Sequence, residues 1–449
     1  MGPKLIHQDA AGKSSKKNSR RLPKRTLNRI IWRWHFWAGL IATPVLMIAS
    51  LTGGIYIFQP EIEQILFPEI LNSKGDSENL TFQQMVDKVV EHEGVGWKPA
   101  ILFIDDQRKN ANRSVFLRGE NHQHKTVYID PYDGEILGQI PEPNFLTVVL
   151  RIHRNLFAGM IGRVFMELTT SWMIVLVASG VWLWWPASFR KLKGVLIPRL
   201  DAGKYTVARD LHSLSGLFLF PIALVIGITG LLYSLVWGTT FILTGFFSGA
   251  FDIEAKPPKS MIPSEQVAKN HSLTADEIYQ IALEKKMPLE RVNLHLPVSE
   301  DDAWSVRSSA GYGPSVEQIL FVDRYSGETI FHSTLSEIPL MAQWTQWNYP
   351  LHVGSVLGWF SKPIWLLACL VLFSLPVSGI WMWLSRRRKG KTGFPKKYDK
   401  KLPRWLILTI AIVAIGLPMV GVSLLVVAII DFIATRKWFR RRLSSEGIA

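Results

Sequence analysis

Five long apolar runs constrain the fold of this chain more than any other feature of its sequence. They lie at residues 34–58, 164–185, 212–247, 363–384 and 405–433. Each run is long enough to cross a hydrocarbon layer of about 30 Å as a helix, and backbone groups in lipid must be hydrogen-bonded within the protein. The sequence therefore predicts a multi-pass helical protein embedded in a lipid bilayer.

The charged residues are unevenly distributed, and their distribution predicts the orientation in the membrane. Residues 1–33 hold ten Lys and Arg against one acidic residue, and residues 385–404 also hold ten against one. The large polar stretches are acidic, with eight basic against fifteen acidic residues in 59–150 and eight against fourteen in 250–350. Because cytoplasmic segments collect Lys and Arg, we expect a cytoplasmic N-terminus and two large domains outside. The basic residues flank membrane spans, so no nucleic acid is expected as a partner.

The chain contains an internal duplication of its membrane runs. Residues of the first run recur in the third with a displacement of 177, and residues of the second recur in the fourth with a displacement of 199. The first set pairs His35, Gly39, Thr52 and Gly53 with His212, Gly216, Thr229 and Gly230, and the second pairs His153, Ser179 and Gly180 with His352, Ser378 and Gly379. Both copies run in the same direction, so they are parallel repeats.

The polar stretches repeat as well. Residues 127–135 and 320–328 are both typical of a strand followed by an Asp-initiated turn with Gly, while 81–86 and 273–278 are typical of capped helix starts. A helix followed by strands indicates a small α+β domain in each copy. The predicted fold class is a membrane all-α helical core of two tandem two-helix repeats plus a broken fifth hydrophobic segment, with two extracytoplasmic α+β domains.

These patterns predict the boundaries of eleven segments. In chain order they are a basic cytoplasmic arm at 1–29, a first span at 30–58, a first outside domain at 59–150, a second span with its lead-in at 151–186, a cytoplasmic loop at 187–210, a third span at 211–247, a second outside domain at 248–345, a fourth span with its lead-in at 346–385, a basic cytoplasmic loop at 386–404, a fifth span or re-entrant hairpin at 405–433 and a C-terminal tail at 434–449.

The fifth apolar run differs from the others because Gly416-Leu417-Pro418 interrupts it and five basic residues follow it. A single crossing would place those basic residues outside. The charge rule therefore favours a hairpin that returns to the cytoplasm over a fifth crossing.

Four of the eleven histidines lie at the membrane and recur between the copies, namely His35, His153, His212 and His352. Ionisable groups at membrane depth are costly and tend to mark function. Each related pair supplies two neutral imidazoles at matched depth, which suits bis-histidine haem b, whereas zinc would need three or four ligands. We therefore expect two haem b groups, one between His35 and His212 and one between His153 and His352.

Small residues share a helix face with two of these histidines. At about 100° per residue, Gly39 and Gly53 fall near the face of His35, and Gly216 and Gly230 repeat the pattern in the second copy. Glycine permits the close approach of a flat macrocycle, so these positions are expected to pack against haem. Helix–helix packing for the glycines, and hydrogen bonding to lipid headgroups for the histidines, are the alternatives.

Other charged residues near the outside histidines allow more than one role. Arg151, Arg154, Arg163 and Lys362 could pair with haem propionates or another anion, or could extend to the interface as ordinary snorkelling side chains. Glu167 has no acidic counterpart in the second copy and could be a proton or metal group, or a partner of a helix dipole. No residue is assigned a catalytic role.

The histidine blocks resemble those of the PepSY-associated transmembrane proteins, a family of bacterial iron-regulated inner-membrane proteins that includes ferrisiderophore reductases. The resemblance rests on residues 34–40 (WHFWAGL), 51–53 (LTG), 211–213 (LHS) and the Ser-Gly-x-Trp-x-Trp endings, and it spans about 30–435. Both outside domains look like PepSY domains.

The resemblance implies a location in the inner membrane with periplasmic large domains, and a haem-dependent enzyme that reduces a ferric siderophore or other ferric chelate. The electron donor would be quinol or a cytoplasmic reductant. A permease for iron, haem or siderophore, and a non-enzymatic PepSY sensor or inhibitor module, are the alternatives.

Overall fold

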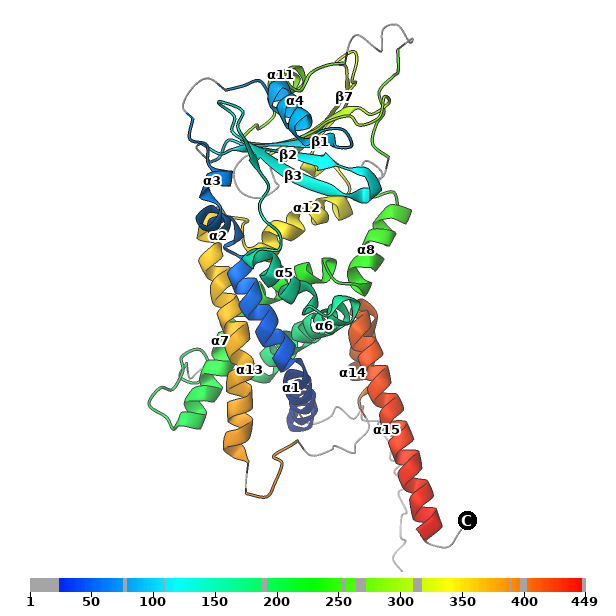
Figure 1. The fold of residues 1–449 in the computed structure, drawn as a ribbon. Helices are drawn as coiled ribbons and strands as arrows, with labels where there is room; N and C mark the ends of the chain where they lie inside the picture. The colour runs from blue at the N-terminus through cyan, green and yellow to red at the C-terminus, as the bar shows by residue number, and fades with distance from the viewer. Residues whose placement is uncertain are drawn as a thin grey trace, which may run out of the picture.

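A computed structural model describes residues 24–75, 79–108, 110–186, 192–251, 256–263, 272–309, 317–387, 389–395 and 402–445. Most of the predicted basic arm, parts of the two basic loops and the side chains of the C-terminal tail lie outside this description. A helical bundle forms one end of the molecule and a β-sheet forms the other (Figure 1).

Four helices of the described chain are long and apolar enough to cross a membrane. They are α1 (Lys24–Tyr56), α6 (Gly159–Trp184), α7 (Lys204–Leu232) and α13 (Lys362–Arg386). Each packs against two others, so the bundle is a ring in the order α1, α6, α7, α13. The equivalent helices α1 and α7 therefore stand diagonally across the ring, with their shared interior between them.

Two short helices carry the chain into α6 and α13. They are α5 (Phe145–Asn155), which packs on α1 and α6, and α12 (Leu340–Val353), which packs on α7. Both end in the left-handed region, at Leu156 with φ of 53° and at Gly354 with φ of 72°. Because such a residue stops a helix, α5 and α12 are separated from the spans that follow them.

The third apolar run, predicted as one span at 211–247, forms two helices. Helix α7 ends at Leu232, and α8 (Val236–Phe247) follows after a short break. The Glu167 carboxylate of α6 accepts the backbone N–H groups of Val236 at 2.7 Å and of Trp237 at 2.9 Å. These two N–H groups have no partner within their own helix, so the carboxylate favours a new helix start at this point.

The fifth apolar run also forms two helices, α14 (Arg404–Gly416) and α15 (Pro418–Ser445), which pack against each other. They meet at Leu417, where Pro418 can begin a helix but cannot continue one. Helix α15 extends away from the sheet end of the molecule (Figure 1).

In the described part of the chain, eight strands form one antiparallel sheet in the order β4-β3-β2-β1-β5-β6-β7-β8. They are β1 (Lys98–Asp105), β2 (Arg113–Arg118), β3 (His124–Ile129), β4 (Ile136–Gly138), β5 (Arg291–His295), β6 (Trp304–Ser309), β7 (Gln318–Val322) and β8 (Thr329–Thr334). The sequence predicted two α+β domains, whereas β1 pairs with β5 and joins the two units into one sheet. Separate units would each leave an unpaired inner edge strand, and pairing removes both edges.

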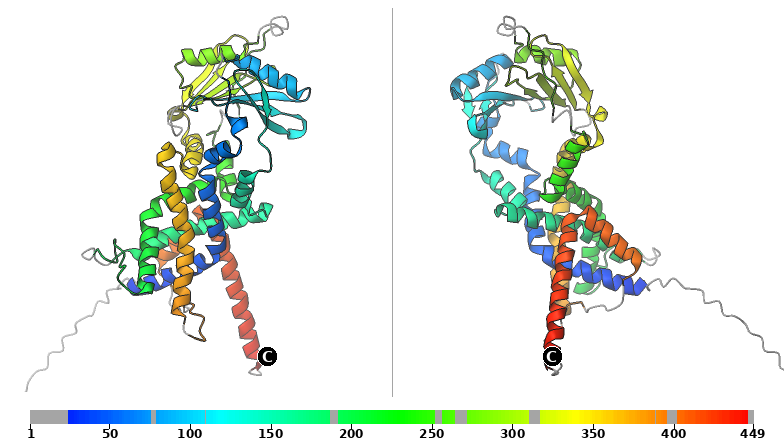
Figure 2. Two further views of the ribbon diagram at one scale, coloured as in Figure 1. Left: turned by 60° about the vertical axis from the view of Figure 1, so that its left-hand side comes forward. Right: turned by 90° about the vertical axis from the view of Figure 1, so that its right-hand side faces the viewer.

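Helices α4 (Phe82–Glu93) and α11 (Ala275–Glu284) cover the sheet face that points away from the bundle (Figure 2). Both begin with a capping box, Thr81 with Gln84 and Thr274 with Glu277, as the sequence predicted. Strands and helices of both copies contribute to one buried apolar core beneath them. The short helices α2 (Gln59–Leu66) and α3 (Pro68–Leu71) connect α1 to the sheet, and single 3-10 turns lie at Glu120–His122, Leu335–Glu337 and Gly358–Phe360.

Candidate functional site

The bundle encloses two cavities, one above the other along its length. The distal cavity, far from the sheet, has a volume of about 650 Å³, and the proximal cavity, near the sheet, has about 390 Å³. Both volumes lie in the range of small-molecule and cofactor sites. Two of the four recurring histidines line each cavity, so the fold brings them together in the predicted pairs.

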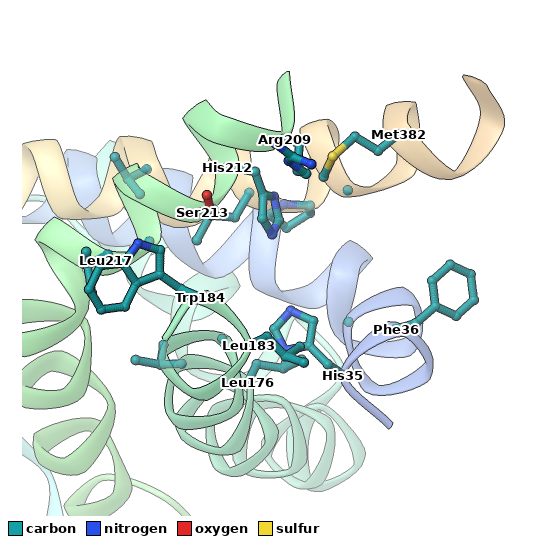
Figure 3. Close-up of a pocket in the computed structure, with 18 of the residues that line it drawn as sticks. His35, Phe36, Leu176, Leu183, Trp184, Arg209, His212, Ser213, Leu217 and Met382 are labelled. Carbon is teal, nitrogen blue, oxygen red and sulfur yellow. The ribbon is translucent and has the colours of Figure 1, made fainter. Parts of the chain in front are cut away.

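The distal cavity receives His35 from α1 and His212 from α7, the diagonal helices of the ring, so the two rings enter from opposite sides (Figure 3). His35 Nδ1 lies 2.9 Å from Ser179 Oγ, and His212 Nδ1 lies 2.8 Å from Ser378 Oγ. Each serine hydroxyl also donates to a backbone carbonyl one turn earlier in its helix. The serine oxygens are then left to accept from Nδ1–H, which leaves Nε2 of each histidine unprotonated.

The proximal cavity repeats this arrangement with threonines. His153 Nδ1 lies 3.1 Å from Thr52 Oγ1 and 3.0 Å from the Ala49 carbonyl, and His352 Nδ1 lies 3.0 Å from Thr229 Oγ1. A carbonyl can only accept, so Nδ1 of His153 carries the proton and Nε2 is a free ligand atom. Such partners fix the ring orientation of metal-binding histidines.

The spacing of the proximal rings fits two ligands on one metal ion. The ring centroids of His153 and His352 are 6.2 Å apart. An imidazole–metal bond is about 2 Å long, and a ring centroid lies roughly 1 Å behind its ligating nitrogen, so two imidazoles on opposite sides of one metal have centroids about 6 Å apart. No group of three or more His, Cys, Asp or Glu suited to a metal ion occurs in the described part of the chain. The donor set therefore suits a macrocycle that supplies the remaining ligands, rather than a zinc ion.

Glycines allow all four histidine rings to approach the neighbouring helices. A Cβ at Gly53 would lie 3.0 Å from Cε1 of His153, and one at Gly230 would lie 3.2 Å from Cε1 of His352. The corresponding distances to the distal rings are 3.5 Å at Gly180 and 3.8 Å at Gly379. Gly180 and Gly379 were not predicted as site residues, although their place in the repeated Ser-Gly-x-Trp-x-Trp motif could have indicated them.

The other predicted glycines, Gly39 and Gly216, line the distal cavity. A Cβ on either would meet a leucine methyl group at 3.7 Å, which is an ordinary contact. These two positions therefore bound the cavity without touching a histidine ring.

The predicted basic residues divide into two groups. Arg154 and Arg163 line the proximal cavity together with Tyr56 and Tyr233. Arg151 is exposed and does not line it. Lys362 is buried and forms an ion pair with Glu61 of α2, so its charge has a partner within the chain.

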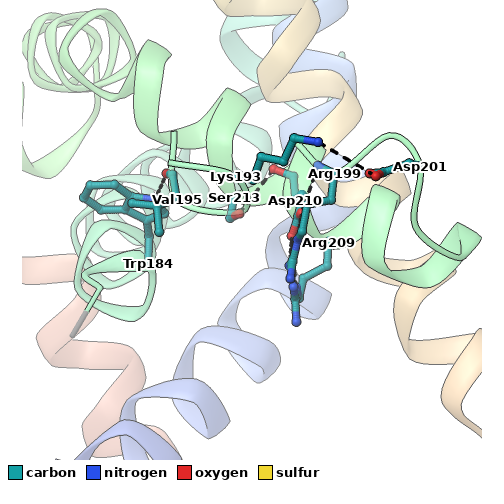
Figure 4. Close-up of polar contacts among 8 residues, drawn as sticks. All are labelled: Trp184, Lys193, Val195, Arg199, Asp201, Arg209, Asp210 and Ser213. Carbon is teal, nitrogen blue, oxygen red and sulfur yellow. Dashed lines mark hydrogen bonds and ion pairs between the residues drawn. The ribbon is translucent and has the colours of Figure 1, made fainter. Parts of the chain in front are cut away.

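The distal cavity has basic residues that the sequence analysis did not select. Arg209 and Arg386 line it, and the buried carboxylate of Asp210 accepts hydrogen bonds from Arg209 and, at 2.7 and 2.8 Å, from Arg199 (Figure 4). Trp184 of α6 donates a hydrogen bond to the Val195 carbonyl at 2.8 Å, so the loop that contains Val195 and Arg199 is bonded to both α6 and α7. The Arg209-Asp210 pair, which ends two positions before His212, could have indicated Arg209 as a site residue from the sequence.

Glu167 lines the proximal cavity and is almost fully buried. Both of its carboxylate oxygens accept backbone N–H groups at the start of α8. The structure thus gives this residue the helix-dipole role, but toward a neighbouring helix rather than its own.

A thin apolar layer separates the two cavities. Leu46, Met173 and Leu372 line both of them, and Ala223 completes the buried cluster. These four are repeat-related, since Leu46 and Ala223 differ by 177 positions and Met173 and Leu372 by 199. The side chains of these four residues are all apolar.

The four-helix ring with its sheet and its two histidine-lined cavities defines a multi-pass membrane protein with two candidate cofactor sites. Residues 32–386 match the family described as PepSY-associated TM region. The match covers well over half of the 449 residues, and the chain belongs to this family, as its motifs predicted. No curated protein matches the chain in sequence.

Proposed function

We propose that this protein is a transmembrane di-haem b oxidoreductase that reduces a ferric siderophore or another ferric chelate. The observation that supports this most is the pair of imidazoles in each cavity, each with Nδ1 held by a hydroxyl group of the neighbouring helix. This arrangement would leave two Nε2 atoms free to bind one haem iron in each cavity. When bound, haem iron supplies one-electron redox chemistry, because it is stable as both ferric and ferrous iron.

The chain's own residues have defined roles in this proposal. The hydroxyl groups of Ser179 and Thr52, with their repeat counterparts, hold the tautomer and orientation of the ligands. Arg154 and Arg163 in the proximal cavity, and Arg209 and Arg386 in the distal one, would offer guanidinium groups to the propionates of each haem.

The apolar layer at Leu46, Met173 and Leu372 favours an electron path over a permease. A solute crossing the bundle would need a polar or open route, whereas this buried cluster closes the space between the cavities. Electrons need no such route. The layer is also expected to hinder the passage of water and protons.

The charge distribution supports the direction of the reaction. The distal cavity is lined by Trp184 and Arg386, which adjoin the basic loops, and the proximal cavity by Tyr56 and His352, which adjoin the acidic polar stretches. By the positive-inside rule, the distal cavity faces the cytoplasm of a bacterial cell and the proximal cavity faces the periplasm. Electrons from quinol or a cytoplasmic reductant would enter distally and leave toward a ferric chelate in the periplasm.

Absorption spectroscopy of the purified protein tests the cofactor. We expect the Soret and α bands of low-spin haem b at two haems per chain, falling toward one in His212→Ala and in His352→Ala. His332→Ala is the matched control, because that histidine lies exposed on β8, where it bonds only Gln318 among the described residues. Absence of a Soret band, or unchanged stoichiometry in both variants, would refute the proposal.

The reaction is tested by reducing the protein anaerobically and adding candidate ferric chelates. Reoxidation of the haem bands with release of ferrous iron is the expected result. Accumulation of labelled chelate in proteoliposomes without a reductant would instead support a permease.

A further inference from the structure

The sheet face that points toward the bundle carries a cluster of basic residues. Cross-strand partners share a face of a sheet. His295 of β5 lies opposite Ile101 and Ser305. Two residues away on the same face, Asn293 of β5 pairs with Arg307 of β6. Arg118 of β2 lies on the same face as its partner Lys98. The alternate residues Leu102, Leu294 and Val306 point to the opposite face and form the core under α4 and α11.

Both arginines are close enough to His295 to influence its ionisation. Burial, and then the charges of Arg307 and Arg118, lower the pKa of His295 to about 4. His295 is therefore neutral at pH 7 and can donate or accept a hydrogen bond. Arg118 is exposed and Arg307 is half-buried, and neither forms an ion pair within the described residues. These guanidinium groups are thus available to a ligand.

Aromatic rings surround this basic cluster on the same face. Phe103 follows Ile101 by two positions in β1, and Phe116 lies opposite Ile101 in β2. Phe321 of β7 lies opposite Ser305, which is itself opposite His295. Phe103 and Phe116 are half-buried, so part of each ring is accessible. The face therefore combines fixed positive charge with flat apolar surface.

This face is turned toward the end of the bundle that holds the proximal cavity. Both views of Figure 2 place α4 and α11 on the side of the sheet away from the bundle, so the basic face is turned toward it. Tyr128, on this face of β3, experiences the charge of Glu63 in α2, the helix that continues α1. The surrounding polar stretches are acidic overall, so a positive cluster at this place is an exception to the composition.

We propose that Arg118, Arg307 and His295 form a binding site for an anionic ferric chelate that carries carboxylate groups. The inference rests on the proposed function, because it assigns the class of substrate that the proximal site would reduce. Guanidinium groups bind carboxylates through two parallel hydrogen bonds, and aromatic faces suit the apolar body of a chelator. A neutral or cationic chelate would gain nothing from the arginines.

Binding of a redox-inert probe to the full-length protein tests the site without requiring electron transfer. The probe is the gallium(III) complex of citrate, measured by titration calorimetry at low salt, with a neutral gallium trihydroxamate for comparison. We expect Arg118→Gln and Arg307→Gln each to weaken citrate-complex binding at least tenfold, and not to change trihydroxamate binding. Added salt should weaken only the citrate complex.

Lys285→Gln is the matched control, because it removes an exposed positive charge at the end of α11, on the other face of the sheet. Equal affinity of wild type, Arg118→Gln and Arg307→Gln for the citrate complex would overturn the proposal, as would a preference for the neutral complex. An unchanged haem spectrum and melting temperature in the variants would show that they fold. If the protein binds no haem but still binds the gallium complex through these arginines, the proposed function fails and the binding site stands.

Discussion

Substitution of Gly53 by alanine tests how closely the ring of His153 packs against α1. The new Cβ would lie 3.0 Å from Cε1 of His153, against at least 3.4 Å for an ordinary contact, so the ring must retreat by about 0.4 Å. That ring cannot retreat freely, because its Nδ1 is bonded to Thr52 and to the Ala49 carbonyl. Overpacking of this kind costs about 1–3 kcal/mol, whereas replacing a helical glycine by alanine gains at most about 1 kcal/mol. The steric term therefore dominates.

If this cost falls on the bound state, the proximal haem affinity should drop roughly 5-fold to 150-fold, at about 1.4 kcal/mol per tenfold. The assay is haem stoichiometry and affinity after reconstitution of the full-length protein, with thermal unfolding measured in parallel. Gly379→Ala is the matched control, because its Cβ would lie 3.8 Å from His212 and should leave haem binding unchanged. The reasoning is wrong if Gly53→Ala retains both haems with wild-type affinity, or if Gly379→Ala is the more damaging change.

Three further predictions follow from other contacts. Thr52→Val and Thr229→Val remove the hydroxyl partners of the proximal histidines, so reconstitution should show 10-fold to 100-fold weaker haem binding in each; unchanged affinity would contradict the ligand assignment. Glu167→Gln keeps the shape but removes the charge at the start of α8, so the free energy of unfolding should fall by about 1–2 kcal/mol, and an unaltered melting curve would contradict that role. His295→Gln should reduce the loss of folding stability at acidic pH. The unfolded chain protonates this histidine near pH 6.5 and the folded chain only near pH 4, so the wild type loses stability as the pH falls between these values. The loss amounts to about 2 kcal/mol at pH 5. The free energy of unfolding is measured by chemical denaturation at pH 7 and pH 5, and an equal decrease in the variant and the wild type would refute this.

Much of the architecture could be predicted from local patterns. The first, second and fourth spans and the capped helices at residues 82 and 275 follow from hydrophobic periodicity and capping residues, which act over a few positions. The third span was predicted too long, because hydropathy does not distinguish α7 from α8. The break between them depends on Glu167, which is 69 positions from the N–H group it accepts.

The strand order of the sheet could not be predicted from the sequence, for a related reason. Alternating patterns predict strands but do not say which strand lies beside which. The pairing of Leu102 with Leu294 joins segments from different copies, and only the packing of both copies on one bundle brings them together. The same holds for Lys362, whose ion pair with Glu61 depends on how α2 lies over the start of α13.

The sequence by itself determined that this protein has membrane-spanning runs, that residues of these runs recur at fixed spacings and that four of its histidines recur in pairs. These properties follow from composition and from repeated spacing, which do not depend on the fold. Only the tertiary structure decided that α1 and α7 stand diagonally, that each pair of histidines lines one cavity, and that hydroxyl groups of neighbouring helices hold the Nδ1 atoms. Those features arise from contacts between segments more than 100 positions apart, and such contacts depend on which helices are neighbours in the bundle.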